Sequence, residues 1–259
     1  MGQGPARLGV DIGGTFTDVV GYDSQSGRLT FGKKLTRRDD LVEGVIDCLG
    51  SAELPLDSIN TLKHGTTQVI NTLLERKGAR IALVTTEGFR DVVEIGRAGR
   101  PIAFDLDYDR DPPLVERDRC VEVAERIDAR GNVVKALSEA ELQRLLDSLG
   151  GLEIEAVAVS LVNAYVNPEH ERRIAAHLRE NRPDLYVTAG TELSREWYEY
   201  ERASTAVANA YIGPRAQGYV NRFSQRLAEE SFPGLFYMMG SNGGVLPLNR
   251  TLEQPIALV

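Results

Sequence analysis

The chain has 259 residues, of which 42% are hydrophobic, so it can bury one large core or two smaller ones. Its formal net charge of −8 argues against a nucleic-acid-binding surface. It contains two cysteines, no CxxC pair, and no apolar run of the length that crosses a membrane. We therefore expect neither nucleic acid nor membrane as a partner. Because unpaired thiols persist in a reducing compartment, we expect a cytoplasmic location.

Short β-branched runs alternate with helical patterns along the first third of the chain. Residues 7–12 and 16–22 are predicted to be two strands joined by a glycine turn, and residues 28–35 a third strand. A helix is predicted at 40–49, where Asp40 and Glu43 have the spacing of a capping box. The next predicted elements are an extended segment at 62–64, a helix at 66–77 closed by Gly78, a buried strand at 80–86 and a short helix at 87–95.

The same alternation continues to the end of the chain. Residues 96–116 are polar and contain prolines, which is typical of a loop. The following predicted elements are a strand at 119–127, a helix capped by Ser138 and Glu141, a strand at 155–162, a helix from Asn167 with Pro168 at its first position, a strand at 185–189, helices at 197–212 and 214–230, and a strand in 235–244. The last apolar run, 254–259, has no visible partner. This order predicts an α/β fold with a mixed sheet, helices on both faces and an antiparallel hairpin at its start.

The stretch GVDIGGTFTDVV, residues 9–20, places two glycines and two threonines between two aspartates. Consecutive glycine N–H groups can form a concave turn that binds an anion, and threonine hydroxyls can donate to phosphate oxygens. Carboxylates tolerate a phosphate when a divalent cation such as Mg²⁺ lies between them. We therefore predict a Mg-nucleotide phosphate site, and the alternative is a hairpin turn without a ligand. The residues concerned are Asp11, Gly13, Gly14, Thr15, Thr17 and Asp18.

Several longer strings resemble known families. VDIGGTFTDVV resembles the first phosphate motif of the actin-like ATPase superfamily. HGTTQVINTLLERKGARIALVTTEGFRDVVEIGR (64–97), RASTAVANAYIGP (202–214) and MGSNGGV (239–245) resemble the hydantoinase A and 5-oxoprolinase family. With AVSLVNAYVNPEHE (158–171), the resemblance extends from about residue 8 to the end of the sequence.

The resemblance implies an actin-like ATPase lobe of the ribonuclease H-like type. It implies a nucleotide-binding N-terminal lobe at 1–195 and the start of a hydantoinase A domain at 196–259, ending before the second phosphate motif. The implied activity is ATP-dependent hydrolysis of a cyclic amide such as 5-oxoproline, a hydantoin or an N-methylhydantoin, with ATP and Mg²⁺ as cofactors. An ATP-dependent ketone carboxylase subunit is the alternative within the family. The chain would then be a fragment or split subunit that works in an oligomer with a hydantoinase B-type subunit or a C-terminal half.

The resemblance also implies roles for individual residues. The glycines and threonines of the turn would surround phosphate, Asp11 would hold Mg²⁺ through water, and Asp18 would be a second polar anchor. His64 is a catalytic candidate because it begins the HGTT segment. The residues that follow it open a helix whose N–H groups could meet an anion. The cofactor-binding residues of this segment are Gly65, Thr66 and Thr67.

Two other functional classes remain open from the sequence. Some sugar kinases also begin with a DIGGT string, but many of those carry a CxxC zinc site that this chain lacks. A regulatory or assembly module would bind nucleotide without turning it over. Phosphorylation of a hexose would indicate the first class, and binding without turnover in the presence of the missing half would indicate the second.

Structural interpretations are preferred for the other polar residues. The basic pairs at 33–34 and 37–38 are interpreted as solvated surface, and His170 and His177 as solvent-facing. Arg97 and Arg100 are expected to pair with the acids of 104–113. Aromatic residues at 197, 198, 200 and 211 are expected to pack in a core. Weak site candidates are Thr205, Asn209 and the GSNGG corner at 240–244.

Overall fold

The structure is a computed structural model that describes residues 6–51, 55–100, 102, 104–105, 107–108 and 110–259. It divides into two compact units: unit 1 lies within residues 1–75 and 215–259, and unit 2 within residues 76–214. The predicted domain boundary at 195–196 does not coincide with a division between these units, and it stays a prediction. No helix in the described part of the chain has both the length and the apolar character that a membrane span requires.

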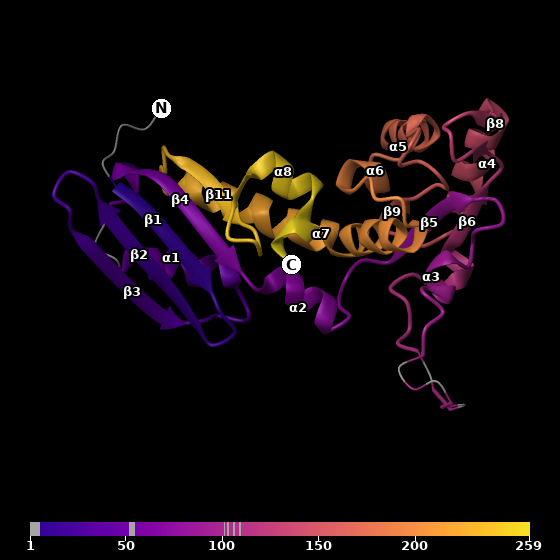
Figure 1. The fold of residues 1–259 in the computed structure, drawn as a ribbon. Coiled ribbons are helices and arrows are strands. Elements are labelled where there is room, and N and C mark those ends of the chain that lie inside the picture. The colour runs from indigo at the N-terminus through magenta and orange to yellow at the C-terminus, as the bar shows by residue number, and fades with distance from the viewer. Residues whose placement is uncertain (1–5, 52–54, 101, 103, 106, 109) are drawn as a thin grey trace. The chain divides into compact units, whose positions relative to one another are not determined.

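Unit 1 contains a six-stranded mixed sheet in the order β12-β11-β4-β1-β2-β3 (Figure 1). The antiparallel start is confirmed, because β1 pairs with β2 and β2 with β3 in antiparallel register. β1, β4 and β11 run parallel, so their carboxyl ends meet at one edge of the sheet. The strands are β1 (Ala6–Ile12), β2 (Phe16–Asp23), β3 (Leu29–Leu35), β4 (Ile59–Thr66), β11 (Leu235–Met239) and β12 (Val245–Pro247).

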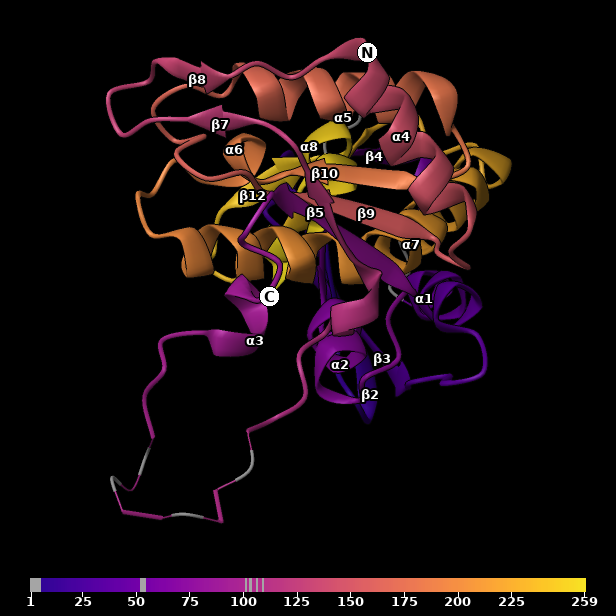
Figure 2. The ribbon, with the colours of Figure 1, turned by 90° about the vertical axis from the view of Figure 1, so that its right-hand side faces the viewer.

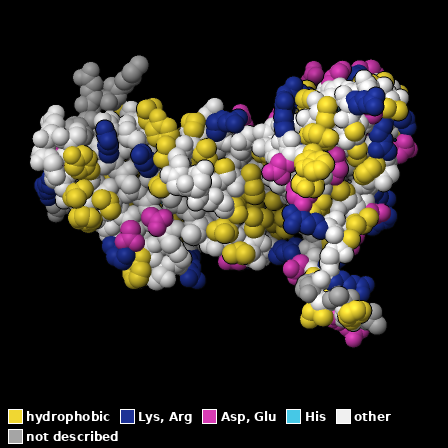
Figure 3. All heavy atoms as spheres, in the orientation of Figure 1, with side chains coloured by type: hydrophobic (Ala, Val, Ile, Leu, Met, Phe, Trp, Pro, Cys, Tyr) yellow, Lys and Arg dark blue, Asp and Glu magenta, His cyan; other side chains and the backbone are white. Residues whose placement is uncertain are grey.

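The alternation of apolar and polar residues decides which face of this sheet is covered. In β1, Leu8, Val10 and Ile12 are buried, whereas Arg7 and Asp11 point to the opposite, exposed face. The exposed face also carries apolar side chains of β2 and β3, which gather where these strands lie in Figure 3. They are Phe16, Val20, Tyr22, Leu29, Phe31 and Leu35.

Helices cover the buried face of this sheet. α1 (Leu41–Gly50) contacts β2 and β3, and Asp40 caps it by accepting a hydrogen bond from Glu43 N at 3.1 Å. The C-terminal part of α7 (Glu199–Glu229) packs against β4 through Phe223 and His64. The other helical elements of unit 1 are the 3₁₀ turns Leu56–Ser58 and Pro255–Leu258, α2 (Gln68–Leu74) and α8 (Leu248–Glu253).

The predicted end of α2 at Gly78 is wrong, because the helix already ends at Leu74. A Cβ on Gly78 would lie 2.2 Å from the ring of Tyr211, so this glycine makes room for a neighbouring side chain instead of capping. The apolar C-terminal run does have a partner within unit 1. Pro255 and Leu258 are buried, and Ser241 N donates to the carbonyl of Ala257 at 3.1 Å.

α7 is one helix of 31 residues where two were predicted. Pro214 lies inside it and removes one backbone donor, yet the helix continues to Glu229. The expected aromatic packing is only partly correct. Tyr211 is buried, but Trp197 and Tyr198 precede the helix and are 64% and 54% exposed.

Unit 2 is built on a four-stranded parallel sheet in the order β10-β9-β5-β6 (Figure 2). α4 (Glu139–Gly150) and α5 (Glu169–Asn181) cover one face, and the N-terminal part of α7 covers the other. Because both faces are covered, all six residues of β5 are buried, as the sequence predicts. The strands are β5 (Ile81–Thr86), β6 (Cys120–Val123), β9 (Ala156–Val159) and β10 (Tyr186–Ala189).

The predicted strand at 119–127 is two strands. β6 ends at Val123, and β7 (Arg126–Ile127) pairs with β8 (Val133–Lys135) in a separate ribbon. The break occurs where Ala124 N donates to the carboxylate of Glu141 at 2.6 Å instead of to a neighbouring strand. The short helix predicted at 87–95 is present as α3 (Val92–Ile95). Two short elements without a sequence signal complete the unit: α6 (Gly190–Leu193) and a 3₁₀ turn (Arg117–Arg119).

Candidate functional site

The glycine turn between β1 and β2 is held by the segment that follows β3. Thr36 donates through Oγ1 to the carbonyl of Gly13 at 2.9 Å and through its backbone N to the carbonyl of Thr15 at 2.9 Å. The guanidinium of Arg38 donates to the carbonyl of Gly14 at 3.0 and 3.3 Å. All three carbonyls of the turn are therefore bound on one side.

Binding of the carbonyls fixes the direction of the amides. In a trans peptide the N–H points opposite to the carbonyl of the preceding residue. The bound carbonyls of Gly13 and Gly14 thus direct the N–H groups of Gly14 and Thr15 to the other side. Neither of these two N–H groups donates a hydrogen bond to any described residue, and both residues are exposed. Two adjacent outward N–H groups form a small anion-binding concavity.

The two glycines serve different purposes, and neither has a positive φ. Gly13 N donates to the carbonyl of Phe16 at 2.9 Å, so this amide closes the turn. A Cβ on Gly13 would lie 3.3 Å from that same oxygen. A Cβ on Gly14 would meet nothing within 4 Å, so the fold itself does not require a glycine there. The bare backbone at Gly14 instead leaves room for a ligand to approach.

Asp11 and Asp18 lie directly opposite each other on the exposed face of the sheet. Asp18 accepts a hydrogen bond from Lys33 Nζ at 2.5 Å, whereas Asp11 has no ionic or hydrogen-bonded partner among the described residues. On its other side Asp11 faces Gly65, where a Cβ would lie 3.0 Å from Asp11 Oδ1. The glycine of the HGTT segment therefore makes space for an open carboxylate.

The end of β4 and the start of α2 lie beside the turn. Thr67 donates to the carbonyl of Ile12 through its backbone N and Oγ1, both at 3.4 Å. Thr66 Oγ1 accepts a hydrogen bond from Gln68 N at 3.1 Å. Thr67 therefore links the ends of β1 and β4, and the hydroxyls of both threonines contact backbone groups of the chain.

The GSNGG corner lies at the same edge, because β11 runs parallel to β4 and ends at Met239. Gly240 N donates to the carbonyl of Gly244 at 2.8 Å, and Asn242 Oδ1 accepts from Gly244 N at 2.9 Å. Three glycine-containing segments that are far apart in the sequence thus end side by side, at the carboxyl ends of β1, β4 and β11. Ligands of open α/β sheets bind at such edges.

Two predicted site residues face away from this edge. Thr17 is 2% exposed, its Oγ1 lies 3.2 Å from Thr36 Oγ1, and its carbonyl accepts from Cys48 Sγ at 3.3 Å. The expectation that Thr17 surrounds phosphate is therefore revised. The alternation of β2 places its hydroxyl on the helix-covered face, where it supports Thr36.

His64 is also revised, from a catalytic to a structural residue. It is fully buried, with Nδ1 3.4 Å from the carbonyl of Val10 and Nε2 2.6 Å from the hydroxyl of Tyr219. A carbonyl can only accept, so Nδ1 carries the proton and Nε2 accepts from Tyr219. Burial lowers the pKa of His64 to about 4, and its ring packs edge-on to Phe223. At neutral pH it is an uncharged member of an aromatic core.

The basic pairs are solvent-exposed, as interpreted from the sequence, but two of their members also make specific contacts. Lys33 neutralises Asp18, and Arg38 binds the turn. The register of the hairpin carries this information, because Lys33 lies opposite Asp18 in the β2–β3 pair. The sequence alone gave no indication that the segment after β3 returns to the turn.

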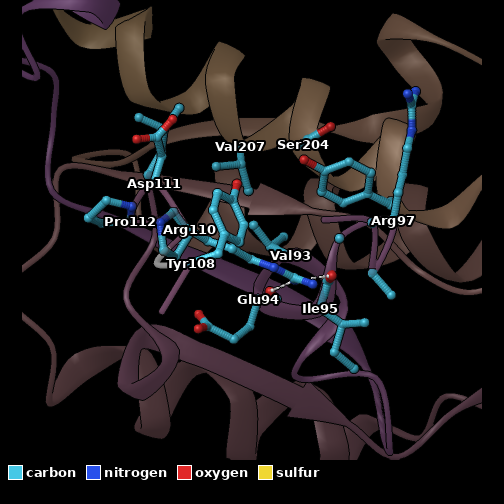
Figure 4. Close-up of a pocket in the computed structure, with 16 residues that line it drawn as sticks. Val93, Glu94, Ile95, Arg97, Tyr108, Arg110, Asp111, Pro112, Ser204 and Val207 are labelled. Carbon is cyan, nitrogen blue, oxygen red and sulfur yellow. Dashed lines mark hydrogen bonds between the residues drawn. The ribbon is translucent and has the colours of Figure 1, made fainter. Parts of the chain in front are cut away.

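A cavity of about 1040 Å³ lies within unit 2, between residues 93–99, residues 108 and 110–114, and α7. Figure 4 shows Arg110 directed at the carbonyls of Glu94 and Ile95, to which it donates. The walls combine apolar side chains and tyrosine and serine hydroxyls with the charged side chains of Glu94, Arg97, Arg110 and Asp111. Gly96 has φ +56° and ψ −136°, a conformation open to glycine alone.

The arginines near this cavity do not pair as expected. Arg97 Nε donates to the carboxylate of Glu201 at 2.6 Å, and Arg100 donates to the backbone carbonyl of Asp105 at 3.4 Å. Of the acids considered as partners, Asp109 lies outside the described residues.

Thr205, a weak site candidate from the sequence, donates to the carbonyl of Glu201 within its own helix at 2.7 Å.

A second polar cluster lies at the carboxyl end of β5 in unit 2, and it is closed. Val162 N donates to Thr86 Oγ1 at 3.0 Å, and Thr86 donates to the carboxylate of Glu125. The other oxygen of Glu125 lies 2.7 Å from His170 Nδ1. His170 is 4% exposed, so the expectation that it faces solvent is wrong. Asn209 is likewise buried and donates to Thr188 Oγ1 at 3.0 Å.

Two family models match the chain. The hydantoinase/oxoprolinase N-terminal region matches residues 7–182, and hydantoinase/oxoprolinase matches residues 202–259. The chain belongs to the hydantoinase/oxoprolinase family. This membership confirms the resemblance drawn from the sequence motifs.

Three relatives show the range of the family. An uncharacterized protein of Methanocaldococcus jannaschii is 38% identical over 98% of this chain and 38% of its own length. The acetophenone carboxylase gamma subunit of Aromatoleum aromaticum is 32% identical over 94% of this chain and 36% of its own length. The caprolactamase subunit alpha of Pseudomonas jessenii is 32% identical over 95% of this chain and 37% of its own length.

The fold agrees with a solved relative. The crystal structure of the ATP-dependent caprolactamase from Pseudomonas jessenii superposes with a TM-score of 0.83 at 31% identity, over 98% of this chain and 38% of that chain. The expected actin-like ATPase-type lobe is thereby confirmed. The chain spans less than two fifths of the length of each of these relatives.

Proposed function

We propose that this chain is the ATP-binding part of an enzyme that uses ATP to hydrolyse a cyclic amide. The observation that carries the proposal is the pair of outward N–H groups at Gly14 and Thr15 beside the open carboxylate of Asp11. Binding of Mg-ATP needs backbone amides that donate to the phosphates and a carboxylate that reaches the cation. The ATP dependence of the related caprolactamase supports the choice of nucleotide.

The residues present fit Mg²⁺. Asp11 is exposed, has no described partner, and has space beside Gly65. No group of three or more His, Cys, Asp or Glu side chains placed to hold a metal ion occurs among the described residues. Mg²⁺ in nucleotide sites is held by one or two carboxylates together with phosphate oxygens and water, so Asp11 suffices for the protein's share.

The turn contributes binding and orientation to the reaction. A bound ATP would supply the phosphoryl group that makes the carbon of an unreactive amide electrophilic enough for water to add, after which the C–N bond of the ring breaks and ADP and phosphate are released. Gly14 and Thr15 hold the phosphates by their amides, and Arg38 fixes the turn from behind through the carbonyl of Gly14. Positioning and charge stabilisation of this kind account for most of the catalysis of phosphoryl transfer.

A ketone carboxylase subunit is the second candidate. The acetophenone carboxylase gamma subunit is as similar to this chain as the caprolactamase subunit, at 32% identity each. The described residues contain no feature that separates an amide from a ketone. The substrate of this chain is therefore proposed as a small cyclic amide first and a carbonyl compound second.

The enzyme is also proposed to need a partner. The two characterised relatives are named as subunits, which supports a multi-subunit assembly with a hydantoinase B-type subunit or a C-terminal half. A cytoplasmic location stays a proposal that rests on the two free and buried thiols, Cys48 and Cys120.

The test is ADP release. The chain is co-expressed with the segment encoded downstream at its locus, and ADP release is measured with caprolactam, 5-oxoproline, hydantoins, acetone and acetophenone in turn. Stimulation by a lactam or hydantoin supports the first candidate, and stimulation by a ketone with bicarbonate supports the second. If a hexose alone stimulates release, or no compound does, the proposal fails.

A further inference from the structure

We propose that Lys33 is a functional part of the phosphate site: it neutralises Asp18, so that Asp11 is the one open carboxylate next to the turn. The inference rests on the proposed function, because it concerns the binding of Mg-ATP at the same turn. It assigns a role to a residue outside the glycine and threonine motifs.

The geometry places one cation and two acids in a row. Lys33 lies opposite Asp18 in the β2–β3 pair, and Asp18 lies opposite Asp11 in the β1–β2 pair. Side chains directly opposite in antiparallel strands are close neighbours on one face of the sheet. Gly65, opposite Asp11 on the other side, adds no charge to the row.

Two contacts fix the position of the Lys33 ammonium. Nζ lies 2.5 Å from Asp18 Oδ1 and 4.6 Å from the centre of the Phe16 ring. Phe16 directly follows the turn, so the cation is held at the start of β2. A cation over an aromatic face is attracted by the ring quadrupole, which adds to the ion pair.

Stability does not explain this pair. The side chains of Lys33 and Asp18 are 56% and 46% exposed, and ion pairs of this kind contribute little to folding. The pair instead changes the local charge. If Asp18 were unpaired, it would add a second negative charge beside the triphosphate, in excess of the carboxylate of Asp11 that reaches Mg²⁺.

The neighbouring lysine provides a matched control. Lys34 lies opposite Thr17, so the alternation of the strand places it on the other face of the sheet from Lys33. Lys34→Met removes the same charge one residue away without changing the row of acids. A general effect of lysine on affinity would appear in both variants, and the proposed effect in Lys33→Met alone.

The experiment titrates the full chain with the non-hydrolysable analogue AMP-PNP in the presence of Mg²⁺. Binding is followed by the amide resonances of Gly14 and Thr15, which report on the turn directly and need no turnover. Wild type is compared with Lys33→Met, Lys34→Met, Asp18→Asn and the double variant Asp18→Asn/Lys33→Met. Thermal unfolding checks that each variant is folded.

We expect Lys33→Met to raise the Kd about tenfold, which corresponds to about 1.4 kcal/mol. Lys34→Met and Asp18→Asn should remain within about threefold of wild type by the same conversion. The double variant should return to near the wild-type Kd, because the unpaired carboxylate is gone. Added salt should reduce the defect of Lys33→Met, since it screens exposed charges.

Other outcomes would overturn the inference in distinguishable ways. If wild type binds and Lys33→Met binds equally well, Lys33 has no role at the site. If the double variant binds as weakly as Lys33→Met, Lys33 contacts phosphate itself and does not act through Asp18. If the Gly14 and Thr15 resonances of wild type do not respond to Mg-AMP-PNP at any concentration, the proposed function fails and takes this inference with it.

Discussion

In unit 1, the edge formed by the carboxyl ends of β1, β4 and β11 carries three polar groups that have no partner among the described residues. They are the backbone N–H groups of Gly14 and Thr15 and the carboxylate of Asp11. In unit 2, the carboxyl end of β5 carries similar residue types, but a backbone amide, a threonine, a glutamate and a histidine satisfy one another in a buried chain. Edges of parallel strands are favoured ligand sites in both cases. The two edges differ in open hydrogen-bonding capacity more than in residue type, and this difference supports the proposal that the edge in unit 1 binds a ligand.

The largest effect is expected at the closed edge. Glu125 is 1% exposed, and Glu125→Ala leaves the hydrogen-bonding groups of Thr86 and His170 buried without their acceptor. Breaking a buried pair in this way costs about 3 kcal/mol or more. Urea unfolding followed by circular dichroism measures the loss.

Glu153 provides the control for that experiment. Its side chain is 88% exposed and pairs with Arg80 on the surface. Glu153→Ala should stay within about 0.5 kcal/mol of wild type. An equal effect of Glu125→Ala and Glu153→Ala would show that the cluster in unit 2 is not a structural chain. The response of the Gly14 and Thr15 amides to Mg-AMP-PNP should survive in the near-isosteric variant Glu125→Gln, because the closed edge is not the nucleotide site.

A second large effect concerns acid stability and the buried histidine of unit 1. His64 has a folded pKa of about 4 against an unfolded value near 6.5, so between these pH values the unfolded chain binds more protons. The free energy of unfolding should therefore fall as pH falls through this window, by about 3 kcal/mol from His64 alone. Titration of the His64 ring by NMR measures the pKa directly.

The variant His64→Phe isolates this contribution. It keeps an aromatic ring beside Phe223 but leaves Tyr219 without its acceptor, so it should be less stable than wild type at pH 7.5. Its stability should then change less between pH 6.5 and 4.5 than that of wild type. Burial raises the pKa of Glu171, which acts in the opposite sense in both proteins and cancels in the difference. An unchanged pH dependence in His64→Phe would show that His64 is not the responsible group.

Much of the fold follows from local sequence. The glycine hairpin, the cap at Asp40, the cap at Ser138 and the fully apolar β5 are all where the patterns predict. These features depend on residues that are near in sequence. The error at Gly78 has a long-range cause, because the ring of Tyr211 occupies the space that a side chain there would need. The break predicted before Pro214 is absent, because α7 continues through this residue.

The site was predictable in outline and not in detail. The motif identifies the turn, and the parallel register brings the HGTT and GSNGG segments to it. The face of the sheet that a threonine occupies depends on which residue of the strand begins the alternation. Thr17 was therefore assigned wrongly to the face proposed for the ligand. The return of Thr36 and Arg38 to the turn depends on the conformation after β3, for which the sequence has no local signal.

A moderate effect is expected from the open carboxylate. Asp11→Asn removes the charge that would reach Mg²⁺, so the Kd for Mg-AMP-PNP should rise at least about tenfold. The affinity for AMP-PNP without Mg²⁺ should not fall, because the loss of a nearby negative charge favours an anion. Calorimetric titrations with and without Mg²⁺ separate the two effects. An equal loss under both conditions would mean that Asp11 supports the turn instead of the cation.

The smallest effect is expected at Gly14, and it distinguishes a site from a plain hairpin. Gly14→Ala meets no atom within 4 Å and requires no positive φ, so stability should change by less than about 0.5 kcal/mol. Gly13→Ala should be the more destabilising change, since its Cβ would lie 3.3 Å from the carbonyl of Phe16. For nucleotide binding the new methyl group at Gly14 covers the outward amides, and the Kd for Mg-AMP-PNP should rise about three- to tenfold. If Gly14→Ala binds as wild type does, the phosphates do not approach the backbone at this point, and the open edge of unit 1 is no more a binding site than the closed edge of unit 2.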